Sequence, residues 1–379
     1  MSAFELILHG MADVVTNPLT LLYLLAGTFG GIIFGAIPGL TGALGVSLML
    51  PFTFSMPPTQ GIAMLIGIYV GGVSGGLIAS IMLNIPGNAA AIVTCFDGAP
   101  MARNGHPYRA LSYGATASLI GGIFSGIVMI LVATKLARFG LMFGSWEYFA
   151  LGIMGLAVVV SLCSEDMIKG LISAILGMIL AMVGLDKLSF VERFTFGYWR
   201  LSSGFTEMTV LMGLFQLKNL GQPMHEVQSD ERRTVIPQKG SFKGLWRTIS
   251  ISSIIGTLIG ILPGVGQSTA ALVAYNQAKN SSKTPEKFGT GCAEGIVAPE
   301  SANNAVCGGA LIPMMTLGIP GDTITAMLMS GLIVHGLAPG AMLFDHNPEV
   351  VGTIYFAYIL ACVVMYVLYI IFIRHFIKI

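Results

Sequence analysis

The stretch that decides the fold is Gly-Ile-Ile-Phe-Gly-Ala-Ile-Pro-Gly-Leu at residues 31–40, because it returns as Gly-Thr-Leu-Ile-Gly-Ile-Leu-Pro-Gly-Val at 256–265. A second landmark, Leu-Asn-Ile-Pro-Gly at 83–87, returns as Leu-Gly-Ile-Pro-Gly at 317–321. The first pair is offset by 225 positions and the second by 234, so the second copy carries a net insertion of nine residues. The repeat predicts two homologous halves, each with two Pro-Gly interruptions.

Composition assigns the chain to the membrane. Hydrophobic residues make up 54% of its 379 residues and charged residues only 10%, whereas soluble domains carry about 25% charged residues. Several apolar stretches approach or exceed the length needed to cross a bilayer; they are 19–37, 111–134, 148–163, 167–185, 248–262 and 350–373. An all-α polytopic membrane protein is therefore expected. The net charge of +1 argues against a nucleic-acid partner, and the five cysteines form no CxxC pair that could indicate a metal site.

Interrupted helices at matched positions of two halves indicate a secondary transporter. We expect helix breaks near mid-membrane at the four Pro-Gly pairs, namely Pro38, Gly39, Pro86, Gly87, Pro263, Gly264, Pro320 and Gly321. Glycines spaced by four residues precede two of the breaks and favour close helix packing. The prediction is a pair of inverted repeats with re-entrant hairpins, in which 31–97 corresponds to 256–331.

The expected organisation has three parts. Residues 1–217 form an N-terminal membrane repeat, 218–247 a linker, and 248–379 a C-terminal membrane repeat that is shorter than the first. The linker is rich in Lys and Arg, which places it in the cytoplasm under the positive-inside rule. Residues 1–18 lack Lys and Arg, so they do not resemble a signal peptide.

The polar residues beside the breaks are neutral hydroxyls and amides, which can bind carboxylate oxygens or complete an oxygen cage for a small cation. The predicted substrate-binding residues are Thr41, Asn84, Asn88, Ser301, Asn303, Asn304 and Thr323. The predicted cation-binding residues are Pro38, Gly39, Gly264, Gln267, Ser268, Asn303, Asn304 and Asp322. Asn303 and Asn304 are expected at the centre, between the two copies.

Charge constrains the substrate. Segments 24–97, 248–275 and 301–344 contain no Lys or Arg, and two helix ends supply only about one positive charge. A di- or trianion would therefore need a co-bound cation, Na⁺ or H⁺. Neutral oxygen ligands favour Na⁺, because only Asp322 and Glu300 near the breaks could carry a proton. No Walker sequence is present, so ATP is not expected to drive transport.

An enzyme and a channel-like subunit are the two alternatives to a secondary transporter. An enzyme would need a nucleophile–base pair or a metal-ligand cluster, and the histidines are isolated in the sequence; we expect no enzymatic activity and no cofactor beyond the coupling ion. The alternative of a channel-like or energy-coupling subunit without its own carrier cycle stays open, and flux without saturation would favour it.

Asp97, close to Arg103 and Arg109, is expected in a loop at the membrane surface.

Six motifs in order resemble one family. They are Gly-Ala-Ile-Pro-Gly-Leu (35–40), Ile-Tyr-Val-Gly-Gly (68–72), Asn-Ile-Pro-Gly (84–87), Asp-Gly-Ala-Pro-Met-Ala-Arg-Asn-Gly (97–105), Pro-Glu-Ser-Ala-Asn-Asn-Ala (299–305) and Leu-Gly-Ile-Pro-Gly (317–321). From about residue 20 onward the chain is similar to the large membrane subunit of tripartite tricarboxylate transporters.

The resemblance implies a multi-pass permease of the bacterial inner membrane that takes up a tricarboxylate such as citrate, or a related di- or tricarboxylate, by symport. It implies two partners, a small membrane subunit and a periplasmic solute-binding protein, and leaves a homo-oligomer open. It also implies an elevator architecture like that of ion-transporter-superfamily carriers. Family members usually continue beyond this C-terminus, and only 58 residues follow Gly321; either the chain is a truncated product or the missing spans are supplied otherwise.

Overall fold

The computed structural model describes residues 2–140, 167–185, 191–202 and 241–377, with scattered positions between 142 and 153 and at 204–205. The described residues fall into two compact units, one within Met1–Met142 and Glu226–Ile379 and the other within Phe143–His225. The predicted span at 148–163 and the predicted linker up to residue 240 lie largely or wholly outside the described residues.

The first repeat is a run of helices interrupted at its Pro-Gly pairs. After α1 (Ala3–Thr16) come α2 (Pro18–Ala36), α3 (Gly42–Thr53), α4 (Pro58–Met82), α5 (Ile92–Arg103) and α6 (Pro107–Gly140). Asn17 caps α2 and Pro18 occupies its first turn, where a missing N–H costs nothing. The helix stops before Pro38, and Gly39 has φ +90°, a conformation that side chains rarely adopt.

The second repeat follows the same order. It contains α10 (Trp246–Ile261), α11 (Gly266–Ser281), the short 3₁₀ helix η2 (Pro285–Lys287), α12 (Glu294–Leu317), α13 (Thr323–Val334), α14 (Met342–His346) and α15 (Pro348–Phe376). All four Pro-Gly pairs lie in connections between helices. Gly264 has φ +78°, close to the value at its counterpart Gly39.

The packing of the first repeat recurs in the second. In each copy the first long helix packs along the third, α2 on α4 and α10 on α12. Between the copies the partners are exchanged, because α6 packs along α12 while α15 packs along α4. This exchange is what an approximate two-fold relation between the halves would produce. Helices α4 and α12 form the core of the unit and are buried along almost their whole length.

Glycines at equivalent positions of the two repeats make equivalent close contacts. A Cβ on Gly35 would overlap the Gly72 carbonyl, and a Cβ on its counterpart Gly260 would overlap the Val306 carbonyl. Gly87 lies against Gly35 and Gly76 in the first repeat. In the second repeat Gly321 lies against Gly260 and Ala310, the equivalent residues. The glycines spaced by four residues therefore allow the helix backbones to approach closely, and they do so at equivalent positions in both repeats.

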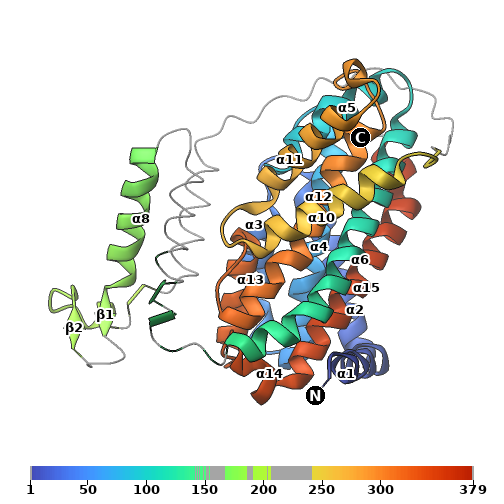
Figure 1. Cartoon of the computed structure of the whole chain (residues 1–379). Coiled ribbons are helices and arrows are strands. Elements are labelled where there is room, and N and C mark those ends of the chain that lie inside the picture. Colours follow the sequence, from blue (N-terminus) through green and yellow to red (C-terminus); the bar gives the residue numbers. More distant parts are fainter. Residues whose placement is uncertain are drawn as a thin grey trace. The chain divides into compact units, whose positions relative to one another are not determined.

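Four described helices are long and apolar enough to cross a membrane, namely Pro18–Ala36, Pro58–Met82, Pro107–Arg138 and Pro348–Phe376. The chain is thus a mostly helical polytopic membrane protein. The apolar-stretch prediction omitted α4, although it is the most buried of the four and is no less apolar than α2. The N-terminus and α14 lie at one end of the long bundle, and α5 and the C-terminus lie at the other (Figure 1).

The second unit is described only in part. It contains helix α8 (Met167–Ala181), which covers most of the predicted stretch 167–185, and a short antiparallel pair of strands, β1 (Gly184–Leu185) and β2 (Glu192–Arg193). A 3₁₀ turn, η1 (Trp199–Leu201), follows the strands.

Candidate functional site at the helix breaks

The N-termini of α3, α11 and α13 meet at the breaks of the second repeat. Gln267, in the first turn of α11, donates from Nε2 to Asp322 Oδ2 at 3.0 Å. The two breaks of this repeat are joined by a hydrogen bond from the Gly264 N–H to the Gly321 carbonyl, at 2.9 Å. The start of α3 lies beside the start of α13, since a Cβ on Gly42 would be 3.0 Å from Ile324 Cδ1. Three helix N-termini therefore direct their positive ends toward one region.

Asp322 organises this region. It is the N-cap of α13, and its Oδ1 accepts from the Thr325 N–H at 2.7 Å and from the Thr325 hydroxyl at 2.8 Å. Its Oδ2 accepts from Gln267 and from the hydroxyl of Tyr69, which reaches across from α4 in the other repeat at 2.7 Å. A carboxylate with four donors is fixed in position and places one negative charge among the helix N-termini.

Accessible hydroxyls lie at the same N-termini. Thr41 caps α3 and is half-buried, while Ser268 and Thr323, in the first turns of α11 and α13, are exposed. The breaks also leave Pro38 and Gly39 exposed. The site thus offers hydroxyl and backbone N–H donors without a Lys or Arg from the same segments.

The second break of the first repeat has different chemistry. Asn84 is exposed in the left-handed region, with φ +55°, which asparagine tolerates better than most residues. Asn88 accepts from the Ala91 N–H at 2.9 Å and donates to the Val73 carbonyl at 3.1 Å. Asn88 is therefore the positional equivalent of Asp322, with an amide in place of the carboxylate.

A buried polar network crosses α12 next to the breaks. The Glu300 carboxylate accepts from Thr94 at 2.6 Å and from Ser118 at 3.1 Å. Asn304 donates to Ser118 and to the Glu300 carbonyl and accepts from Ser74 at 2.7 Å. These contacts occupy the principal hydrogen-bonding positions of Asn304 and link α4, α5, α6 and α12 within the helix core.

The three predicted ligands on α12 differ in their surroundings. Ser301 is fully buried, and its hydroxyl donates to the Val297 carbonyl of its own helix at 2.7 Å. Asn304 belongs to the network just described. Asn303 is 1% exposed, and its side-chain oxygen accepts no hydrogen bond from any described residue. A buried carbonyl oxygen without a donor is costly, so among the three Asn303 has the unused binding capacity.

Asp97 contradicts the expectation of a surface loop. It lies inside α5 with 0% exposure, and its carboxylate accepts from the backbone N–H groups of Gly289, Gly291 and Cys292 at 2.8–3.0 Å. The Tyr275 hydroxyl adds a donor at 2.9 Å. Burial and the Asp97 carboxylate raise the pKa of the Cys292 thiol to about 12. Asp97 thus joins α5 to the α11–α12 connection.

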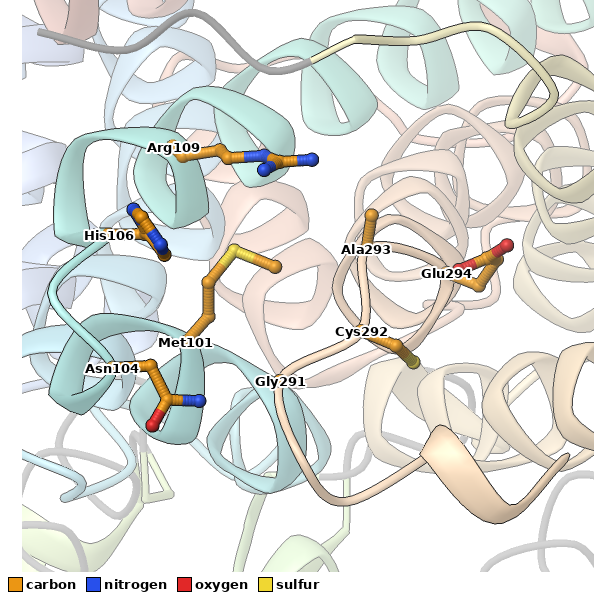
Figure 2. Close-up of a pocket in the computed structure, with 8 residues that line it drawn as sticks. All are labelled: Met101, Asn104, His106, Arg109, Gly291, Cys292, Ala293 and Glu294. Carbon is orange, nitrogen blue, oxygen red and sulfur yellow. The ribbon is translucent and has the colours of Figure 1, made fainter. Parts of the chain in front are cut away.

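A polar recess of about 310 Å³ lies beside this junction. Figure 2 shows His106 and Arg109 on one side of the recess and Cys292 and Glu294 on the other. The recess is at the end of the bundle, away from the α13 N-terminus, and it includes none of the residues predicted to bind substrate.

Sequence reasoning missed several participants. Tyr69, Ser74, Thr94 and Ser118 each contact a break or the Glu300 network. Tyr69 stands in the Ile-Tyr-Val-Gly-Gly motif, so the motif carried a signal for it. The serines and the threonine had none, because a single hydroxyl in a helix is equally compatible with a bond to its own backbone.

The fold and the breaks define the class of a membrane transport protein. The chain matches the tripartite tricarboxylate transporter TctA family over residues 21–379 and belongs to that family, the large membrane subunit of these systems. Membership implies a small membrane subunit and a periplasmic binding protein as partners.

Two curated relatives come from Agrobacterium vitis. An uncharacterized 52.8 kDa protein in TAR-I ttuC' 3'region is 33% identical over 342 residues, which cover 89% of this chain and 68% of the relative. An uncharacterized protein in TAR-II ttuC' 3'region is 42% identical over 93 residues, which cover 24% of this chain and 38% of that relative. No solved structure matches the chain.

Proposed function

We propose that the chain performs secondary active uptake of a di- or tricarboxylate across the bacterial inner membrane, with a cation as the coupling ion. The observation that carries this proposal is the meeting of three helix N-termini at Asp322, with accessible hydroxyls of Thr41, Ser268 and Thr323 around it. Carboxylate oxygens accept hydrogen bonds from such hydroxyls and from the N–H groups of a helix N-terminus.

The charge balance supports a co-bound cation. Three helix N-termini contribute about 1.5 positive charges in total. The Asp322 carboxylate cancels one positive charge of that total. The remaining charge is too small to hold a di- or trianion, and the breaks supply no Lys or Arg. Na⁺ fits better than H⁺, because amide, hydroxyl and backbone oxygens are the ligands that hard cations prefer.

We also infer that the two repeats are inverted. Helix α13 runs antiparallel to α4, as shown by the contacts of Gly61 with His335 and of Tyr69 with Asp322. It runs in the same direction as α12, because it starts beside Ala310 and the chain beyond it reaches Gly318 at the end of α12. The central helices of the two halves would then point in opposite directions, as inverted repeats require.

The charges at the two ends of the bundle support an orientation. The end with α5 and the C-terminus (Figure 1) carries most of the basic residues: Arg103 and Arg374 in the last turns of α5 and α15, Arg109 in the first turn of α6, Lys243 and Arg247 at the start of α10, and Lys279, Lys283 and Lys287 at the end of α11 and in the connection after it. The opposite end carries Lys135 and Arg138. The positive-inside rule then assigns the more basic end to the cytoplasm. The opposite end would receive substrate from the periplasmic binding protein, and the family resemblance supports an elevator movement between the two sides.

The test is uptake of a radiolabelled tricarboxylate into proteoliposomes that contain the chain, its small membrane partner and the binding protein. At fixed pH, replacing Na⁺ by choline should abolish concentrative uptake. Undiminished uptake in choline, together with loss of activity in Asp322→Asn or Glu300→Gln, would reject Na⁺ coupling in favour of protons. Flux that rises linearly with substrate and never concentrates it would favour a channel-like subunit instead.

A further inference from the structure

The two repeats place different side chains at one pair of equivalent positions. At the offset of 234 residues, Asn88 corresponds to Asp322 and Tyr69 corresponds to Asn303. In the structure Tyr69 crosses from the first repeat and donates to Asp322 in the second. At the same offset, the pair equivalent to Tyr69 and Asp322 is Asn303 in the second repeat and Asn88 in the first.

Hydrogen bonds on α4 agree with this placement. Asn88 donates to the Val73 carbonyl at 3.1 Å. The next residue of α4, Ser74, donates to Asn304, which is adjacent to Asn303, at 2.7 Å. Asn88 and Asn304 therefore bond to adjacent residues of α4, and Asn303 directly precedes Asn304 on α12.

The two equivalent side chains, Tyr69 and Asn303, differ in length. A tyrosine hydroxyl extends past its ring, so Tyr69 closes the contact to Asp322 directly. An asparagine side chain is shorter by the length of that ring, and the oxygen of Asn303 stays unpaired although the residue is 1% exposed. A buried oxygen that lacks a donor is stabilised by a cation.

The chemistry of the neighbours selects the ligand. Asn88 uses its side-chain oxygen as an acceptor for the Ala91 N–H, and a carbonyl oxygen has a second lone pair for a further partner. Both side chains are amides, so they offer neutral oxygens and do not titrate near neutral pH. Segments 24–97 and 301–344 contain no Lys or Arg that could compete for these oxygens.

We propose that the buried oxygen of Asn303, together with Asn88 at the first-repeat break, forms a second Na⁺ site that is separate from Asp322. The inference rests on the proposed cation coupling and deepens it, because a second site means that two Na⁺ ions bind in each transport cycle. The first-repeat site is uncharged and the second-repeat site carries a carboxylate.

The probe is NaCl, with choline chloride at equal ionic strength as the reference, added to the purified full chain during thermal unfolding. Asn303→Leu keeps the number and branching of the side-chain heavy atoms, at a larger volume, and removes the oxygen. This variant should raise the half-saturating Na⁺ concentration by about 10–100-fold, which is the usual loss of metal affinity when a group around a metal site is removed. In choline it should unfold at the wild-type temperature or above, since no unpaired oxygen is left buried.

Two further variants complete the design. Asn303→Asp keeps an oxygen ligand and adds a charge, so it should respond to less Na⁺ than the wild type and keeps the test valid if Asn303→Leu does not fold. Thr353→Val is the matched control, because it removes another buried hydroxyl oxygen that accepts no bond, in α15 against α1. Its Na⁺ response should equal that of the wild type.

Uptake in proteoliposomes gives the stoichiometry. The Na⁺ dependence of the wild type should be sigmoidal with a Hill coefficient near 2, and that of Asn303→Asp should remain so, whereas Asn303→Leu should approach 1. A wild-type Na⁺ response that is unchanged in Asn303→Leu would overturn the second site while leaving cation coupling intact. A wild-type protein with no Na⁺ response would contradict the proposed coupling itself.

Discussion

The second breaks of the two repeats have the same backbone but different charges. In the first repeat Asn88 accepts the Ala91 N–H at 2.9 Å, and in the second Asp322 accepts the Thr325 N–H at 2.7 Å. These N–H groups are equivalent at the offset of 234 residues. Capping needs only an oxygen, which either side chain supplies. The carboxylate of Asp322 is therefore more than the cap requires, and its charge points to function.

Exchanging the two side chains should give the largest effect. Asp322→Asn keeps the N-cap and removes the charge, so the half-saturating Na⁺ concentration for uptake should rise by about 10–100-fold. Asn88→Asp makes the reverse change: it keeps the cap oxygen and adds a charge, so the half-saturating Na⁺ concentration should fall, as for Asn303→Asp. Both are measured by initial uptake rates against Na⁺ concentration, with the amount of each variant in the membrane quantified. Equal losses from the two exchanges would remove the distinction between the breaks.

The glycines that precede the first breaks should show how alike the repeats are. Gly35→Ala and Gly260→Ala each place a methyl group into a facing backbone carbonyl, so each should lower the free energy of unfolding by about 1–3 kcal/mol. Gly30→Ala is the control, because nothing lies within 4 Å of its Cβ position, and it should stabilise its helix by up to about 1 kcal/mol. Thermal unfolding in detergent measures all three. Tolerance of alanine at only one of the two close contacts would show that the repeats do not pack alike.

The smallest expected effect is on the rate at which the Cys292 thiol is alkylated, and it comes from a difference between α5 and α13. Asp97 in α5 has Gly331 as its counterpart in α13. Helix α5 therefore binds the α11–α12 connection through a carboxylate, whereas α13 has no carboxylate at the equivalent position. Because burial and the Asp97 carboxylate raise the Cys292 pKa to about 12, little thiolate is expected at pH 8, and alkylation should be slow. Asp97→Asn removes a nearby negative charge, lowers that pKa and should speed alkylation. This is measured in a variant that keeps Cys292 as its single cysteine. Fast labelling of Cys292 beside an intact Asp97 would contradict the contact.

The sequence alone predicted the repeat and the sites of interruption, because Pro-Gly pairs and four-residue glycine spacing are local signals. It did not predict which side chains meet across the repeats. Tyr69 contacts Asp322 over 253 positions of sequence, and a long-range contact of this kind has no periodicity to reveal it. The sequence also grouped Asn303 with Asn304. Neighbours on a helix point about 100° apart, so one enters the Glu300 network and the other does not.

Asp97 was misjudged for a related reason. Charged residues close to it along the chain suggested a surface position, because surface loops of membrane proteins are rich in charge. Three of its four donor groups are backbone N–H groups in a connection nearly two hundred residues away. Backbone donors leave no mark in the sequence, so a carboxylate satisfied by them cannot be told from an exposed one.

If the repeats are inverted, equivalent residues of the two halves lie on opposite sides of the membrane. Thr16 precedes α2, and Ser241, its equivalent at the offset of 225, precedes α10; both are exposed. Thr16→Cys and Ser241→Cys, each in a cysteine-free variant, are labelled in intact cells with a membrane-impermeant thiol reagent. With inverted repeats, Thr16→Cys should react from the periplasm, whereas Ser241→Cys should react only after the membrane is opened. Labelling of both positions from the same side would contradict it.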